Sequence, residues 1–139
     1  MAGSTGGFAE LFGAVVAEGP ERVALACGAR RWTYAELDAW TGRWAAWLRS
    51  RGLRAGDRVA LLLPRSPEWV AAVVAAAKAG VVFVPVDPAY PPARREQMLA
   101  DAGASLVLGT EPAPGVVDLR SADFAAELAA VAPARPWPV

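Results

Sequence analysis

Residues 75–88 read Ala75-Ala76-Ala77-Lys78-Ala79-Gly80-Val81-Val82-Phe83-Val84-Pro85-Val86-Asp87-Pro88. The alanines favour a helix, and Gly80 can take the left-handed conformation that commonly ends one. Residues 81–84 are apolar on both faces, which is typical of a strand covered by helices on two sides. Pro85 and Pro88 then end the strand, because proline has no backbone N–H to donate. This stretch therefore predicts the junction of a βαβ unit.

The rest of the chain places strands and helices on both sides of this junction. Thr33 and Glu36 form the pattern of a capping box, and Ser66 and Ser121 are further N-cap candidates. Strands are expected at residues 23–27, 31–33, 58–63, 81–84, 105–108 and 116–119, and helices at 7–18, 34–51, 67–79, 92–102 and 122–130. Strands that alternate with helices predict an α/β fold with an open, mostly parallel sheet.

Length and composition set the domain organisation. A chain of 139 residues with 55% hydrophobic and 20% charged residues is one folded domain at most. We expect a flexible N-terminus over residues 1–7 and a folded unit over 8–131. Residues 132–139 are rich in proline and are expected to form a linker.

Several classes of partner and location are disfavoured by the same composition. The formal net charge is zero, so no electrostatic attraction to nucleic acid or to an anionic membrane is expected. No apolar run approaches the roughly 20 residues of a membrane span, and no secretory signal is recognisable. The single cysteine, Cys27, cannot form an internal disulfide and is expected to be a small buried hydrophobic residue. These features predict a cytoplasmic protein.

The common catalytic and cofactor motifs are missing from the sequence. Without histidine, neither a Ser-His-Asp triad nor a histidine metal site can form. Neither a GxGxxG after a strand nor a GxxxxGK[ST] loop occurs. The glycine-rich residues 3–7 could cradle a phosphate, but they follow no strand, and a flexible tail is favoured. We therefore assign no catalytic, cofactor-binding or metal-binding residue.

Some side chains allow a functional and a structural interpretation. Lys78 could be a catalytic amine, but a surface cation at a helix end is favoured. Asp87 could lie at a pocket rim beyond a parallel strand, but turn formation between two prolines is favoured. Four carboxylates could serve in acid–base chemistry, but stabilisation of a helix start is favoured for each: Glu10, Glu36, Asp38 and Glu68. Three tryptophans could stack on nucleic-acid bases, but a core or interface face is favoured for them: Trp40, Trp44 and Trp47.

Two segments resemble a known family. Residues 32–37 (Trp-Thr-Tyr-Ala-Glu-Leu) are similar to the (Thr/Ser)-Tyr-x-Glu-Leu motif of acyl- and aminoacyl-adenylating enzymes. Residues 78–88 are similar to their Lys-Ala-Gly-x-x-(Tyr/Phe)-Val-Pro-x-Asp-Pro motif. Both occur in the correct order, and the best resemblance is to the adenylation domain of nonribosomal peptide synthetases. Trp32, Ala77 and Val82 depart from the usual residues without affecting the expected fold.

The resemblance implies the first part of the large N-terminal domain of such an enzyme. It identifies the family-motif residues, which we expect to be structural: Thr33, Tyr34, Glu36, Leu37, Lys78, Ala79, Gly80, Val84, Pro85, Asp87 and Pro88.

A complete enzyme of this kind would use ATP and Mg²⁺ to form an aminoacyl-adenylate and would then load a phosphopantetheine carrier. Its phosphate loop, substrate pocket and catalytic lysine would lie after residue 139, so this chain alone is expected to be inactive. The implied partners are the rest of the adenylation domain and a carrier or helper protein. The alternative is a non-catalytic, truncated adenylation-like module that docks a partner protein or the rest of a split or interrupted synthetase.

Overall fold

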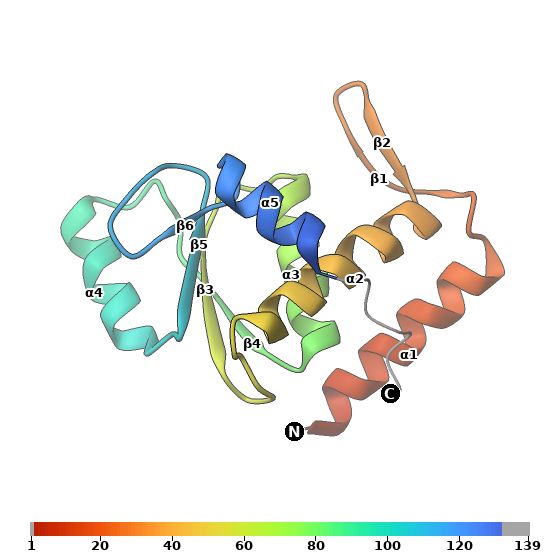
Figure 1. Ribbon diagram of the computed structural model, residues 1–139, viewed down its shortest axis with the longest axis horizontal. Helices are drawn as coiled ribbons and strands as arrows, with labels where there is room; N and C mark the ends of the chain where they lie inside the picture. Colours follow the sequence, from red (N-terminus) through yellow and green to blue (C-terminus); the bar gives the residue numbers. More distant parts are fainter. Residues whose placement is uncertain (1, 132–139) are drawn as a thin grey trace.

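A parallel sheet flanked by helices forms the body of the protein (Figure 1). The computed structural model describes residues 2–131, with side chains from Glu10 onward. The helices are α1 (Ala2–Glu18), α2 (Tyr34–Ser50), α3 (Pro67–Ala79), α4 (Pro92–Ala102) and α5 (Ala122–Ala130). The strands are β1 (Val23–Cys27), β2 (Arg30–Thr33), β3 (Arg58–Leu62), β4 (Val82–Pro85), β5 (Leu106–Gly109) and β6 (Val117–Asp118). No described helix is both long and apolar enough to span a bilayer.

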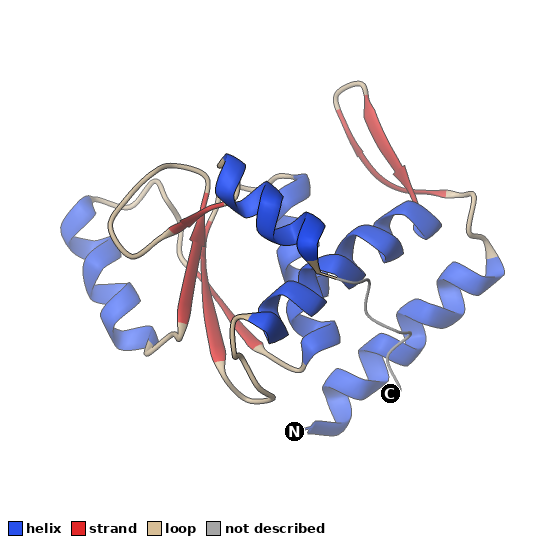
Figure 2. Cartoon of the chain, in the orientation of Figure 1, coloured by secondary structure: helices blue, strands red, loops and turns tan. Residues whose placement is uncertain are grey.

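The sheet has the order β4-β3-β5-β6, and every pairing within it is parallel. Ala60 of β3 pairs with Val84 on one side and with Val107 on the other. Helix α4 covers one face, whereas α2, α3 and α5 gather on the other (Figure 2). Strands β1 and β2 form a separate antiparallel hairpin. The predicted α/β class with an open parallel sheet is confirmed.

The hydrophobic core lies between the sheet and helices α2, α3 and α5. Side chains from α2 and α3 pack there against alternate residues of β3 and β5, as the period of a strand requires. Its most buried large side chains, each 2% exposed or less, are Trp44, Trp47, Leu48, Val59, Leu61 and Leu108. The tryptophan stripe predicted on residues 34–51 is therefore a core face.

The helix starts follow the predicted capping pattern. The Thr33 hydroxyl accepts a hydrogen bond from the Glu36 backbone N–H at 3.1 Å, and the Glu36 carboxylate accepts one from the Thr33 backbone N–H at 2.8 Å. Ser66 and Ser121 accept from Trp69 and Phe124 in the same way. Gly80 ends α3 in the left-handed conformation, with φ of 73°. Local sequence therefore determines where α2, α3 and α5 begin and where α3 ends.

Replacing Thr33 with alanine should lower the free energy of unfolding by about 1 kcal/mol, because the substitution removes one half of the capping box. Urea denaturation followed by circular dichroism measures the change. Thr33→Ser is the matched control, since it keeps the hydroxyl and should stay within about 0.5 kcal/mol of the parent. Equal losses in both variants would contradict a capping role.

Four sequence-based expectations need correction or stay open. Helix α1 begins at Ala2, so part of the stretch expected to be flexible over residues 1–7 has helical backbone. Strand β4 lies at the edge of the sheet, and Val82 is 51% exposed, so the strand is not covered on both faces. Cys27 is exposed because it closes the β1–β2 hairpin outside the core. The linker expected at 132–139 lies outside the described residues.

Candidate functional site

A cavity of about 650 Å³ lies at the carboxyl ends of the parallel strands. Leu62 and Pro64 reach it from the end of β3, Pro88 and Ala89 from beyond β4, and residues 109–113 from the end of β5. Arg95 of α4 and Arg120 after β6 complete its lining. The connection after β3 leads to α3 on one face, and the connection after β4 leads to α4 on the other. Open α/β sheets bind ligands where successive connections diverge in this way.

Asp87 lies on the rim of a neighbouring cavity of about 210 Å³, together with Arg65 and Trp69. Its carboxylate accepts a hydrogen bond from the Ala89 backbone N–H at 2.9 Å, and its carbonyl accepts one from the Tyr90 N–H at 3.1 Å. Both interpretations of Asp87 therefore hold, because the residue shapes a turn and also borders a cavity.

Lys78 is buried, which contradicts the expectation of a surface cation. Its Nζ donates to the Asp38 carboxylate at 2.6 Å and to the Asp38 carbonyl at 3.0 Å, and lies 5.1 Å from the centre of the Phe12 ring. Burial lowers the pKa of Lys78, and the hydrogen bond and charge of Asp38 offset part of that shift. The lysine joins α3 to the first turns of α2 and lines neither cavity.

The carboxylates considered for acid–base chemistry are spread over separate elements. Glu36 serves the capping box, Glu68 lies in the first turn of α3, and Asp38 holds Lys78. Glu10 does not stabilise a helix start as expected, since α1 begins eight residues earlier. In the part of the chain that the structure describes, no group of three or more possible metal ligands comes together.

The tryptophans of α2 form an aromatic cluster rather than an open stacking surface. Trp44 and Trp47 are 2% and 1% exposed. Each meets the Phe124 ring of α5 edge-on, at 5.3 and 4.9 Å between ring centres. Trp40 stacks on Trp32 of the hairpin at 5.3 Å. The core interpretation of these residues is confirmed.

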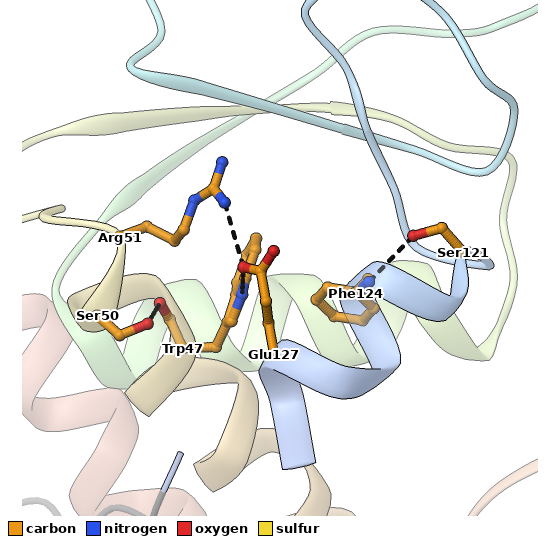
Figure 3. Close-up of polar contacts among 6 residues, drawn as sticks. All are labelled: Trp47, Ser50, Arg51, Ser121, Phe124 and Glu127. Atoms are coloured by element: carbon orange, nitrogen blue, oxygen red, sulfur yellow. Dashed lines mark hydrogen bonds and ion pairs between the residues drawn. The ribbon is translucent and has the colours of Figure 1, made fainter. Parts of the chain in front are cut away.

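Glu127 of α5 is a structural residue that the sequence did not reveal. Its carboxylate accepts hydrogen bonds from Trp47 Nε1 at 3.0 Å and from the Arg51 guanidinium at 3.1 Å (Figure 3). The partners are 80 and 76 residues apart in the chain, so no local pattern indicates the contact. It fixes α5 to the carboxyl end of α2.

The family-motif residues lie in two structural groups. Thr33, Tyr34, Glu36 and Leu37 start α2, and Lys78, Ala79 and Gly80 end α3. These two ends meet, because α2 and α3 pack together and Lys78 bonds Asp38. Val84, Pro85, Asp87 and Pro88 lie in or after β4, where Pro85, Asp87 and Pro88 border the two cavities.

The phosphate-loop candidate in the sequence is not a loop in the structure. The glycine-rich residues 3–7 have helical backbone within α1 rather than a loop after a strand. A nucleotide site of the loop-and-helix type therefore does not fit this part of the chain.

A family model described as AMP-binding enzyme matches residues 12–136, which is most of the chain. The chain belongs to the AMP-binding enzyme family. Within this family it matches the N-terminal portion of adenylation domains of nonribosomal peptide synthetases, as the two motifs and the parallel sheet indicate.

Two synthetases illustrate the sequence similarity. The chain is 48% identical over 101 residues to the probable non-canonical nonribosomal peptide synthetase CymA of Salinispora arenicola (strain CNS-205), covering 73% of this chain and 1% of CymA. It is 42% identical over 100 residues to syringomycin synthase SyrB1 of Pseudomonas syringae pv. syringae, covering 72% of this chain and 16% of SyrB1. This chain therefore spans only a small part of these relatives.

A solved structure gives the same placement. The N-terminal subdomain of Klebsiella oxytoca NpsA, in complex with anthranilyl-AMSN, superposes with a TM-score of 0.79 at 30% identity. The superposition covers 94% of this chain and 34% of that subdomain. About two thirds of the NpsA N-terminal subdomain thus has no counterpart in this chain.

Proposed function

We propose that this chain supplies the N-terminal part of an amino-acid-activating adenylation domain. The complete domain would form an aminoacyl-adenylate from an amino acid and ATP with Mg²⁺, and would transfer the acyl group to a phosphopantetheine carrier. The observation that carries the proposal is the family match over residues 12–136, supported by motifs placed at the start of α2 and across the α3–β4 junction. We also propose that the protein acts in the cytoplasm.

The role of this part is structural. Phosphoryl and acyl chemistry needs donors aimed at the charge that develops in the transition state. The motif residues instead cap α2, end α3 and shape the turn after β4. The expected partners are the rest of the adenylation domain and, through it, a carrier or helper protein.

The isolated chain should show no amino-acid-dependent exchange of pyrophosphate into ATP and no heat of ATP binding in calorimetry. The physical reason is that its glycine-rich residues 3–7 form helix rather than a phosphate loop, and that no three possible metal ligands come together among its described residues. A complete adenylation domain from CymA, assayed in parallel, is the positive control. Exchange by the isolated chain that rises with any single amino acid would refute the proposal of inactivity.

An exposed sheet edge supports a second candidate function. Strand β4 ends the sheet, and Val82 on it is 51% exposed. A non-catalytic module could use such an edge to dock a partner protein. Reading the codons that follow in the gene separates the two proposals. An in-frame phosphate loop, directly or after an inserted domain, supports the adenylation domain, whereas a stop codon followed by unrelated genes supports the docking module.

A further inference from the structure

Helix α4 carries a cation on the face that it turns toward the sheet. Arg95, Met98, Leu99 and Ala102 are half-buried, while most other residues of α4 are exposed. Their spacing of three, four and seven residues defines one stripe of a helix. A half-buried charge is unfavourable unless an opposite charge or hydrogen bonds compensate it. One guanidinium nitrogen of Arg95 donates to the Pro88 carbonyl at 3.3 Å.

Arg120 lines the same 650 Å³ cavity as Arg95. The ion pairs among the described residues are Arg51–Glu127 and Lys78–Asp38, so neither cavity arginine has a carboxylate partner there. Glu111 is the acidic residue in the lining, and two guanidinium groups against one carboxylate leave one positive charge in excess. This excess suits one carboxylate, whereas a polyphosphate would bring several negative charges next to Glu111.

The α4 side of the sheet is also the more thinly covered side. Phe83 points to the opposite side, where its ring meets Trp69 of α3 at 6.4 Å. Since strand residues alternate, Val82 and Val84 point to the α4 side. Val82 is 51% exposed and Val84 is half-buried. An apolar edge therefore lies on the same side of the sheet as α4, which carries Arg95.

We propose that the remainder of the adenylation domain packs on this side and inserts a carboxylate side chain into the cavity between Arg95 and Arg120. This inference rests on the proposed function. The occupant follows from the unpaired guanidinium groups and from the two thirds of the NpsA subdomain that this chain does not match. The carboxylate would complete the charge balance of the cavity, and the apolar body of the remainder would cover Val82.

The test compares the same substitutions in the isolated chain and in a chimera. The chimera is a CymA adenylation domain in which this chain replaces the segment that it matches. Arg95→Gln and Arg120→Gln should each lower the melting temperature of the chimera by about 1–2 °C, as expected for loss of a partly exposed ion pair in a large domain. In the isolated chain Arg120→Gln should leave the melting temperature unchanged, because Arg120 is exposed and has no carboxylate partner there. Arg95→Gln should lower it by less than in the chimera, because only the hydrogen bond to the Pro88 carbonyl is lost.

Arg94→Gln is the matched control. Arg94 neighbours Arg95 on α4 but lies outside the cavity lining, with its guanidinium 5.0 Å from the Tyr90 ring centre. Arg94→Gln should change the melting temperatures of the chimera and of the isolated chain by the same amount.

The possible failures are distinguishable. A chimera that does not fold overturns the proposed function. A folded chimera in which Arg95→Gln and Arg120→Gln have no effect, or the same effect as in the isolated chain, overturns only the carboxylate contact. The contact is likewise overturned if inorganic phosphate stabilises the isolated chain through both arginines, since that result would assign a small-anion site.

Discussion

Replacing Trp47 with alanine should lower the free energy of unfolding by about 3–5 kcal/mol, which is a large part of the stability of an ordinary domain. Trp47 is 1% exposed, and its ring lies 4.9 Å from that of Phe124. Its indole N–H also supplies one of the two bonds that hold Glu127. The substitution would thus open a core cavity and release α5 from α2. Urea denaturation monitored by circular dichroism gives the change.

Two variants separate these causes. Trp47→Phe keeps an aromatic ring but removes the N–H donor, so it should cost clearly less than alanine. Trp32→Ala removes a half-buried indole that stacks on Trp40 outside the main core, and it should cost about 1–2 kcal/mol. If Trp47→Ala lowered the free energy of unfolding by no more than Trp32→Ala does, the α2–α5 contact would not support the fold.

The Lys78–Asp38 pair should give the second large effect. Lys78→Ala removes a side chain that is 5% exposed and joins α3 to α2, and it should cost about 2–4 kcal/mol. Lys78→Met keeps most of the volume without the charge and should recover much of this loss. Asp38→Asn should cost about 1–2 kcal/mol, because the Asp38 side chain is 46% exposed and water partly replaces it. Equal stability of the alanine and methionine variants would contradict the packing role.

The pH dependence of stability tests the charge of Lys78 separately. Its pKa is lower in the folded chain, chiefly through burial, than in the unfolded chain. Between the two pKa values the unfolded chain binds more protons, so the free energy of unfolding should rise as the pH increases toward about 10.4. Lys78→Met lacks this contribution. The free energy of unfolding of the parent should therefore rise relative to that of Lys78→Met over this pH range. Parallel pH profiles would show that burial does not perturb the lysine.

Local sequence patterns were sufficient to predict most helices and strands of the fold. Thr33, Ser66 and Ser121 each cap the helix that follows, and Gly80 ends α3, because capping depends on neighbours within one turn. The alternation of strands and helices then led to the parallel sheet. The environment of Lys78 was predicted wrongly, since Asp38 lies 40 residues away and composition cannot place the two helices together.

The candidate site was only partly predictable. The position of Asp87 after an expected strand indicated a cavity rim, because carboxyl ends of parallel strands meet at one edge. Arg95 and Arg120 were not singled out, since their convergence depends on the strand order β4-β3-β5-β6. Cys27 is exposed because its hairpin lies outside the core, and Val82 is exposed because its strand lies at the edge of the sheet. Local composition predicts neither position.

The central claim is that these residues form an exchangeable structural part of an adenylation domain. Amino-acid-dependent pyrophosphate exchange by the chimera with CymA measures it most directly. The account predicts exchange within about tenfold of the unmodified CymA domain and with the same preferred amino acid, because this chain supplies scaffold only. A chimera that folds as the parent domain does but shows no exchange, or that prefers a different amino acid, would contradict it.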